Sequence, residues 1–491
     1  MSLPESGEAL PPAALRVIER LQDANERLQA QNDRLEKQNG RLHGKVDRLL
    51  AQVKRLHKLL EAALRAGKRQ AAPFSKGKPK KNPKKPGRKP GPDHGPANFR
   101  PPPESIDRNL DAPLPGECPC CGGQLTLDFV AEQYQWDIPP IEPQVTQFNV
   151  SVGHCSDCGE RVQGRHPEQT SDALGAAARQ IGPNAIAVAA HLNKVVGATY
   201  EKMAVFFRIA FRFPVAASTL VRAMLRLARK MEPSYQAIRA IVRTSPVVYP
   251  DETGWRICGR RAWLWVFVGD RAVLYVIARY RGFSVAQWAL GKNFSGFLGH
   301  DGWSIYDDFE KAIHQTCLGH LLVRCKNLLE TATKRAVSFP RELKAIFKDA
   351  FALRDRALAG ELQGHGLLVA LGRLKARLEG LLSMTLTHRG NARLAKHVEN
   401  HKNELFTFVE HPHLLEGTNA PAEQETRPAV ILRKISGCNK TWRGAHAHEV
   451  LVSVLRTAWH RSVEELQFII EALRWRGTEA PLPAFLTGPG P

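Results

Sequence analysis

The sequence lacks any run of 18 consecutive apolar residues, and its first residues, MSLPESGEAL, lack the basic and then apolar pattern of an export signal. We therefore expect neither a membrane-spanning segment nor export. Acidic residues are few relative to basic ones, because 48 Asp and Glu against 70 Lys and Arg leave a formal net charge of +22. Such a surplus indicates a polyanionic partner. With membranes set aside, we expect a cytoplasmic protein that binds nucleic acid.

Cysteine is also sparse, with nine in 491 residues, which argues for a reducing compartment and against a disulfide framework. Four cysteines form two Cys-x2-Cys pairs, each followed by the glycine that a tight sulfur-binding turn needs: Cys118 with Cys121, and Cys155 with Cys158. Four thiolates in a tetrahedron hold one structural Zn²⁺. Residues 130–153, between the pairs, alternate like short strands, which predicts a zinc ribbon. Cys120 is a spare thiol, and His154 is a weaker alternative ligand.

The first 66 residues carry a heptad repeat. Leucine recurs at every seventh position, as Leu21, Leu28, Leu35, Leu42, Leu49 and Leu56. The residues three positions earlier are Ile18, Asn25, Asn32, Asn39, Val46 and Val53. This pattern predicts a coiled coil with leucine at d, in which asparagine at a favours a parallel pair and selects the partner. We expect a homodimer or larger assembly, and the alternative is a single solvated helix.

Residues 67–105 form a basic segment rich in proline and glycine, which predicts an extended linker without a core. Its positive charge suits a phosphate backbone. The basic residues expected to contact DNA are Lys80, Lys81, Lys84, Lys85, Arg88 and Lys89. The stretch PGRKPG, residues 86–91, loosely resembles a minor-groove-binding AT-hook. Non-specific attraction to DNA and a solvated spacer remain alternatives.

Residues 171–245 have a helical pattern, in which a first helix, the break RFPVAAS and a basic second helix resemble a helix-turn-helix. Arg222 on the second helix is therefore expected to contact DNA. The alternative is an ordinary helical bundle whose basic residues form a solvated face.

From residue 246 the pattern changes to strands. Three apolar runs, at 247–257, 262–269 and 272–280, predict an antiparallel meander, and a helix and a fourth strand follow. This order is that of a ribonuclease-H-like α/β domain, in which one acid lies on the first strand and another just beyond the fourth. Asp251 and Asp301 occupy those places. Glu252 must face the opposite side of its strand and is expected to have a hydrogen-bonding or structural role.

Long blocks of this sequence resemble the insertion sequence 66 family of transposases. They include DETGWRICGRRAWLWVF from residue 251, HDGWSIYDDF from residue 300 and EGTNAPAEQETRP from residue 416. The resemblance implies a transposase active in DNA recombination, located on the bacterial nucleoid. It implies the DDE acids Asp251, Asp301 and Glu423, which hold two Mg²⁺ ions for cleavage and strand transfer at terminal inverted repeats of double-stranded DNA. Helper proteins of the same element are possible partners. The competing interpretation is a non-catalytic DNA-binding regulator or an inactive copy.

The third acid is assigned to Glu423 because the family's block places it there, while the nearby Glu425 faces away on a helix. The long, helical segment before it resembles the all-α insertion of several DDE transposases. Cys317 and His320 match a Cys-x2-His motif of related transposases, for which structural packing and metal binding are both open. Phosphate contacts are expected from some of the basic residues Arg427, Arg433, Lys434 and Arg443, and the alternative is plain surface charge.

We thus predict a multidomain chain. Its parts are a leucine-zipper coiled coil (1–66), a basic linker (67–105), a zinc ribbon (106–170), a helical helix-turn-helix region (171–245), an α/β ribonuclease-H-like catalytic core (246–324 and 411–475) interrupted by an all-α insertion (325–410), and a C-terminal tail (476–491).

Overall fold

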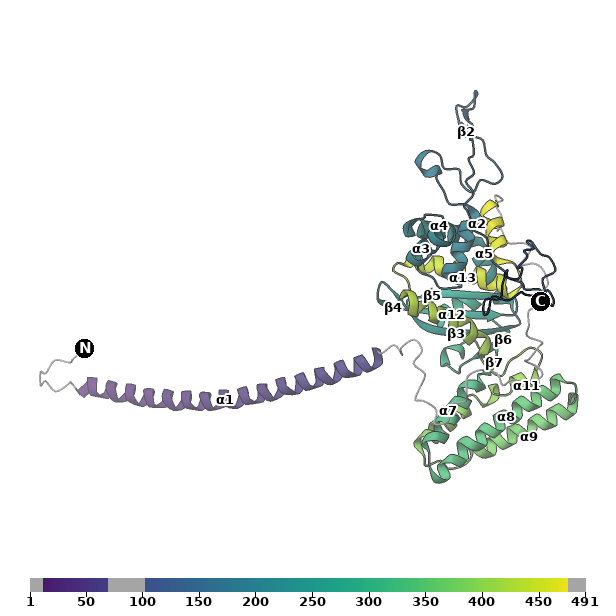
Figure 1. Cartoon of the computed structure of the whole chain (residues 1–491). Helices are drawn as coiled ribbons and strands as arrows, with labels where there is room; N and C mark the ends of the chain where they lie inside the picture. Colours follow the sequence, from purple (N-terminus) through teal and green to yellow (C-terminus); the bar gives the residue numbers. More distant parts are fainter. Residues whose placement is uncertain (1–11, 69–101, 476–491) are drawn as a thin grey trace. The chain divides into compact units, whose positions relative to one another are not determined.

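The computed structural model describes residues 12–68 and 102–475 and has a mixed α/β architecture (Figure 1). The chain divides into two compact units, residues 1–110 and 111–491, which are taken separately below. The basic linker residues Lys80, Lys81, Lys84, Lys85, Arg88 and Lys89 lie outside the described residues, as does the tail after residue 475. Among the described residues, no helix is both long and apolar enough to span a membrane.

The first unit contains one helix, α1, which spans Pro12–Lys68. All six heptad leucines are exposed on it, including Leu21, which is 65% exposed, and Leu56, which is 64% exposed. A heptad stripe aligns along one side of a helix. The predicted helix is confirmed, and its apolar stripe is exposed within the first unit.

The predicted strands between the two cysteine pairs are wrong for most of their length. Residues 124–151 have no regular secondary structure, and only the short strands β1 (Val152–His154) and β2 (Arg161–Gln163) pair, antiparallel, around the second cysteine pair. The segment contains Pro139, Pro140 and Pro143, which have no N–H to donate to a ladder. Most of its apolar side chains are exposed, so no core stabilises a strand there.

The next segment contains a short helix and four longer ones: η3 (Gly175–Ala178), α2 (Pro183–Lys194), α3 (Tyr200–Ala210), α4 (Ala217–Lys230) and α5 (Glu232–Thr244). The predicted first helix is in fact two helices. Gly197 has a φ of 82°, which glycine adopts without strain, and Thr199 then caps α3 by accepting from the backbone N–H of Lys202. The chain therefore turns between α2 and α3.

A five-stranded sheet forms the centre of the second unit, with the order β5-β4-β3-β6-β7. The strands are β3 (Val247–Ile257), β4 (Arg260–Gly269), β5 (Val273–Ala278), β6 (Phe297–His300) and β7 (Ile313–Thr316). The first three form an antiparallel meander, and helix α6 (Phe283–Leu290) leads to β6, which runs parallel to β3 and to β7. The predicted sequence of three strands, a helix and a fourth strand is present.

Both faces of the sheet are covered, as the alternation of side chains along a strand requires. On β4, Trp265 and Phe267 join one apolar core with α2 to α6 and the C-terminal helices, whereas Leu264 and Val266 join a second core with the later helices. Helix α12 packs on β3 and β4, and Figure 1 shows α2 to α5 above the sheet and α7 to α9 below it.

The remaining elements are mostly helical. They are η4 (Ser304–Tyr306), α7 (Leu318–Thr331), η5 (Lys334–Val337), α8 (Ser338–Leu358), α9 (Gly364–Leu382), α10 (Arg389–Asn400), η6 (Lys402–Glu404), α11 (Thr407–Glu410), α12 (Ala420–Ser436), α13 (Trp442–His460) and α14 (Glu465–Arg474). The expected helical character of residues 325–410 is present.

Helix α12 is joined to α13 and the sheet by a buried ion-pair network around Glu425. The carboxylate accepts from the Arg456 guanidinium at 2.6 and 2.7 Å, contacts the His460 ring at 2.9 Å and accepts from the Tyr275 hydroxyl at 2.9 Å. Although burial opposes ionisation, hydrogen bonds from His460 and Arg456 lower the pKa of Glu425 to about 2. Glu425 therefore has a structural role on the side of α12 that faces α13.

We predict that this network makes the second unit sensitive to acid. Because the folded-state pKa of Glu425 is depressed, its stabilisation is present above pH 5 and is lost as the pH falls toward 2. The contribution is on the order of 3 kcal/mol. Urea unfolding should show Glu425→Gln destabilised by about that amount at pH 7, with a smaller dependence on pH between 5 and 3 than the parent chain.

The exposed Glu342, whose carboxylate lies 2.7 Å from Arg377, provides the control. Glu342→Gln should change the unfolding free energy by less than about 1 kcal/mol. Equal effects of the two substitutions would contradict the assigned role of Glu425.

Candidate active site at the carboxyl ends of two parallel strands

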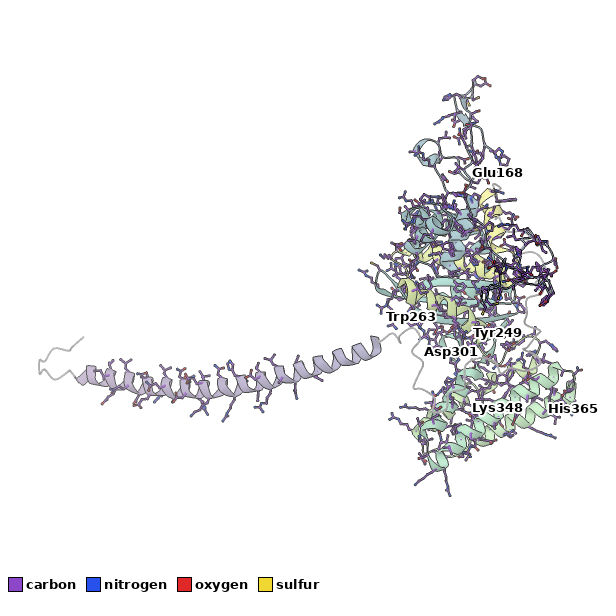
Figure 2. The ribbon with its side chains drawn as sticks, viewed as in Figure 1. Glu168, Tyr249, Trp263, Asp301, Lys348 and His365 are labelled. Atoms are coloured by element: carbon purple, nitrogen blue, oxygen red, sulfur yellow. The ribbon has the colours of Figure 1, made fainter. Side chains whose placement is uncertain are left out.

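The pairing of β3 with β6 brings Asp251 and Asp301 to the same level of the sheet. Val247 lies opposite Phe297 and Val248 opposite Leu298, so the same register carried forward places Asp251 opposite Asp301. Neighbouring strands are about 4.8 Å apart. Both acids are half-buried. Asp251 is four residues after Val247 and Asp301 four residues after Phe297, so each has the same facing as that residue, toward the core that contains α12. Figure 2 shows Asp301 between the sheet and the helical segment that carries Lys348.

The turn after β6 fixes the Asp301 carboxylate. Its Oδ1 accepts from the backbone N–H of Trp303 at 3.0 Å, and Gly302 between them has a φ of 83°. A Cβ on Gly302 would also lie 3.2 Å from the Nε2 of His397, so a larger residue would be strained in conformation and in space. The sequence GHDGW therefore forms a tight turn that presents Asp301 at the end of the strand.

Asn419 anchors the start of helix α12, whose first turn carries Glu423. It is the N-cap residue of α12, and its side-chain amide donates to the backbone carbonyl of Pro250 at 2.8 Å. Its backbone N–H donates to the sulfur of Cys317 at 3.1 Å. Glu423 lies in the first turn of α12, one turn after Asn419, and its side chain is exposed. Asn419 thus ties the helix that carries the third acid to the strand that carries the first.

The three acids are close enough to repel one another. Burial raises the pKa of Asp251, and the negative charges of Asp301 and Glu423 raise it further. A set of carboxylate oxygens is the ligand type that Mg²⁺ prefers, and a divalent cation would relieve the repulsion. The donor set therefore fits Mg²⁺.

Cys317 and His320 lie beside Glu423. The ligand atoms of these three residues are all within 4.8 Å of one another, and the His320 Nε2 lies 3.7 Å from the Glu423 Oε1. A hydrogen bond to Cys317 raises the pKa of His320 to about 9, and the charges of Glu423 and Asp301 add to this effect. The structure thus brings the predicted accessory pair to the third acid, where a protonated His320 contacts the Glu423 carboxylate.

Glu252 faces the opposite side of β3 from Asp251, as strand alternation predicted. Arg281 donates to its carboxylate through both Nε and Nη2, and the Tyr306 hydroxyl donates at 3.2 Å. The Arg281 guanidinium also stacks over the Trp303 ring at 3.8 Å. Burial nevertheless raises the pKa of Glu252 to about 7. This hydrogen-bonded group supports the turn after β6 from its other side.

The four predicted zinc ligands form two separate turns. The backbone N–H of Cys118 donates to Gly123 O and that of Cys155 to Glu160 O, each at 2.9 Å, and Gly122 and Gly159 have positive φ. None of the nine cysteines forms a disulfide. Among the described residues, however, no three sulfur atoms of the two pairs come within 4.8 Å of one another. Each cysteine pair thus forms a tight turn, which we call a knuckle, and the binding of one Zn²⁺ by both knuckles together stays a prediction.

The predicted DNA-contacting arginines and lysine within the described residues differ in their surroundings. Arg222 is exposed on α4, whose opposite side is buried, and Arg427 and Lys434 are exposed on α12. Arg433 instead donates to the Thr253 hydroxyl at 3.0 Å and to the Gly254 carbonyl, so it packs α12 against β3. The Arg433 guanidinium is therefore less available for a phosphate contact than the side chains of Arg427 and Lys434.

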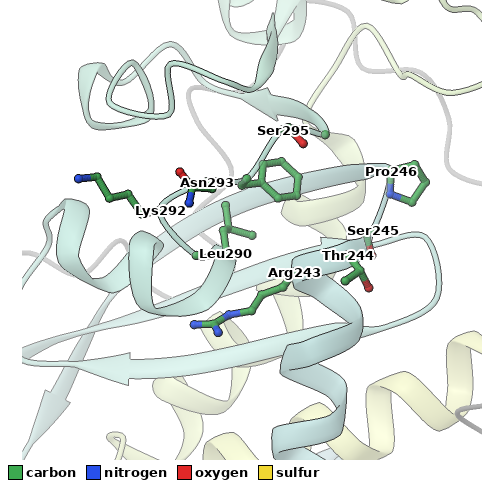
Figure 3. A pocket seen from close by; sticks show the side chains of 11 residues that line it. Arg243, Thr244, Ser245, Pro246, Leu290, Lys292, Asn293 and Ser295 are labelled. Carbon is green, nitrogen blue, oxygen red and sulfur yellow. The ribbon is translucent and has the colours of Figure 1, made fainter.

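A cavity of about 580 Å³ lies at the other end of the parallel strands (Figure 3). It is lined by residues 243–246, which lead into β3, and 290–296, which lead into β6. The Arg243 guanidinium beside it donates to the carbonyl oxygens of Trp288 and Ala289 at 2.6 and 3.1 Å. The three acids do not line this cavity, because they lie at or beyond the carboxyl ends of β3 and β6 and on α12.

Sequence reasoning did not single out the tie made by Asn419, nor the positions of His397 and Arg281 near the acids. The partners of Asn419 are 102 and 169 residues away along the chain, so no local spacing could have indicated them.

The family model described as Transposase IS66 family matches residues 179–447, more than half of the chain. The match includes β3 to β7, the helical segment after them and all of α12. No curated protein matches this chain.

We predict that Asn419→Ala destabilises the second unit by about 1–3 kcal/mol, because the Pro250 carbonyl loses its donor in a buried setting. Urea unfolding measures this change, and Asn403→Ala, at an exposed position, should change stability by less than about 0.5 kcal/mol. A stability of Asn419→Ala within error of the Asn403 control would contradict the assigned tie.

Proposed function

This chain belongs to the IS66 family of transposases, and from that premise we propose that it binds the terminal inverted repeats of its own insertion sequence and catalyses DNA cleavage and strand transfer. The observation that carries the proposal is the register of β3 and β6, which brings Asp251 and Asp301 to one level beneath α12 and Glu423. Two further findings support it: the family match over residues 179–447 and the net charge of +22.

We assign the catalytic core to the ribonuclease-H-like fold. The strand order β5-β4-β3-β6-β7, with β4 antiparallel and β6 parallel to β3, supports this assignment. So does the position of one acid on the first strand and another directly after the fourth. The helices between residues 318 and 410 then correspond to an all-α insertion between the second and third acids.

Asp251, Asp301 and Glu423 would hold two Mg²⁺ ions. When bound, such a pair supplies activation of the attacking oxygen and stabilisation of the leaving oxygen in phosphodiester cleavage and transfer. The protein's own residues supply position. Asn419 fixes α12 relative to Pro250, the Trp303 N–H orients the Asp301 carboxylate, and His320 contacts Glu423. The buried ion pair of Glu425 with Arg456 supports Glu423 rather than Glu425 as the third acid.

DNA binding is assigned to the exposed basic residues. Arg222 on α4, with Arg427 and Lys434 on α12, presents positive charge to solvent and suits phosphate contacts. The α3-turn-α4 arrangement supports a helix-turn-helix. The two cysteine knuckles would form a ribbon around one structural Zn²⁺, for which paired thiolates are the fitting donors. Linker residues 67–105 would add non-specific affinity.

The exposed heptad leucines of α1 support pairing of two copies of this chain. Asn25, Asn32 and Asn39 occupy consecutive a positions, an arrangement that favours a parallel dimer. Pairing suits transposition because two element ends have to be held together before strand transfer.

The alternative is a regulator or inactive copy that binds the element's ends without cutting them. The presence of all three acids in one place argues against it, because binding alone needs no carboxylates among DNA phosphates.

Strand transfer on the element's end DNA with Mg²⁺ or Mn²⁺ tests the proposed activity. The parent chain should be active, and Asp301→Ala should lose at least about a hundredfold in rate, as expected for loss of a group that stabilises transition-state charge. Asp308→Asn changes an exposed acid a few residues away and should retain activity. Tight end binding without cleavage by the parent chain would favour the regulator.

Sedimentation of the full chain tests the coiled coil. Leu28→Lys with Leu35→Lys places charges in the predicted seam and should convert a dimer to a monomer at micromolar concentration. Asp23→Lys with Ala30→Lys adds charge at two outward heptad positions and should leave the dimer intact. A monomeric parent chain, or equal behaviour of the two double variants, would refute pairing through α1.

A further inference from the structure

A second group of metal-ligating side chains lies apart from the three acids. Asp307, His401 and Glu404 each offer a ligand atom, and these atoms are all within 4.8 Å of one another. Asp307 follows η4, His401 ends α10, and Glu404 closes η6. The group therefore joins the segment after Asp301 to the end of the long helical segment.

The geometry of this group suits a metal ion. The His401 Nδ1 and the Glu404 Oε2 are 3.3 Å apart. Two ligands each about 2.0–2.2 Å from a tetrahedral ion are separated by about 3.3–3.6 Å. The Thr316 hydroxyl donates to the same Glu404 oxygen at 2.8 Å, which resembles the hydrogen bonds that orient ligating carboxylates.

Burial gives the group one closed and one open side. His401 is buried and Glu404 half-buried, whereas Asp307 is exposed. On the closed side, the buried His300 has its Nε2 3.9 Å from Glu404, and the His397 ring centroid lies 4.7 Å from that of His401. An ion held there would keep access to solvent through Asp307 for water ligands or exchange.

Charge also favours a cation over a simple ion pair. Two carboxylates face one imidazole, so even a protonated His401 leaves a net negative charge. A divalent ion would satisfy both carboxylates and use His401 as a neutral ligand.

We propose that Asp307, His401 and Glu404 form a second metal site that binds a divalent transition-metal ion such as Mn²⁺ or Zn²⁺. One imidazole with two carboxylates suits these ions better than Mg²⁺, which prefers oxygen ligands alone. The bound ion would fasten the segment 301–307 to α10 and η6, and so steady the turn that presents Asp301. The site does not depend on the proposed transposase activity.

Mn²⁺ binding to the full chain, followed by electron paramagnetic resonance, tests the site. A background of Asp251→Asn, Asp301→Asn and Glu423→Gln removes the carboxylates of the candidate active site. In this background we expect one bound Mn²⁺ that shows hyperfine coupling to a histidine nitrogen. Because the three carboxylates are replaced by amides, the number of Mn²⁺ ions bound in this background does not depend on whether the parent chain performs strand transfer.

Asp307→Asn supplies the decisive variant, because the side chain is exposed and its replacement is least disruptive to folding. It should weaken this Mn²⁺ site at least about tenfold, since loss even of supporting residues commonly costs that much. The matched Asp308→Asn variant should bind as the background does. Glu404→Gln should abolish binding and the nitrogen coupling.

Two results would overturn the proposal. One is the absence of any nitrogen-coupled Mn²⁺ in the background chain. The other is equal Mn²⁺ affinity of the Asp307 and Asp308 variants. A rise in melting temperature on adding Mn²⁺ to the background, lost in Asp307→Asn, would support it by a second measurement.

Discussion

The parallel pairing of β3 with β6 constrains everything else at the candidate active site. Once Val247 lies opposite Phe297, residues four positions further along each strand reach the same edge, and here both are aspartates. Gly299 permits this close pairing, because a Cβ at that position would lie 2.5 Å from the Tyr249 ring on β3. The tyrosine in turn accepts from the backbone N–H of Glu416 just before α12. The strand register and the approach of α12 are therefore set together.

Bringing a third carboxylate to this edge costs free energy, because the three charges repel in partly buried surroundings. Helix α12 is held against that repulsion by contacts spread along its length. Asn419 anchors its first turn to Pro250, Glu425 joins Arg456 on α13, and Arg433 donates to Thr253 near its last turn. Each anchor uses a different face or end of the helix, so the helix can neither slide nor rotate without breaking one of them. Glu423, in the first turn of the same helix, is consequently held close enough to Asp251 for its charge to raise the pKa of that carboxyl.

Local periodicity accounts for what could be predicted from the sequence. The heptads specified α1, and alternating apolar runs specified β3 to β5 and hence the place of Asp251. In residues 130–153 the alternating pattern predicted strands that are mostly absent. The side chains there have no core to pack against, and the prolines cannot donate to a strand ladder. The Asn419 tie and the group of Asp307, His401 and Glu404 depend on residues about one hundred positions apart or more. Such contacts are set by tertiary packing and leave no trace in local spacing.

The chain carries a net charge of +22, yet three carboxylates gather at the candidate active site: Asp251, Asp301 and Glu423. Two histidines near Asp301 do not offset the negative charge of the acids. Burial lowers the pKa of His300 to about 3 and that of His397 to about 4, so both rings are neutral at pH 7. The pKa values of His320 and His401 are raised instead, but the carboxylates that these two histidines contact are Glu423 and Glu404 rather than Asp251 and Asp301. A DNA phosphate approaching Asp251 and Asp301 would therefore meet uncompensated negative charge. In the proposed function, the exposed lysines and arginines would attract DNA to the protein as a whole, whereas seating a phosphate among these acids would require bound cations. The excess of negative charge at this one point thus favours a metal-dependent site over a surface for DNA binding alone.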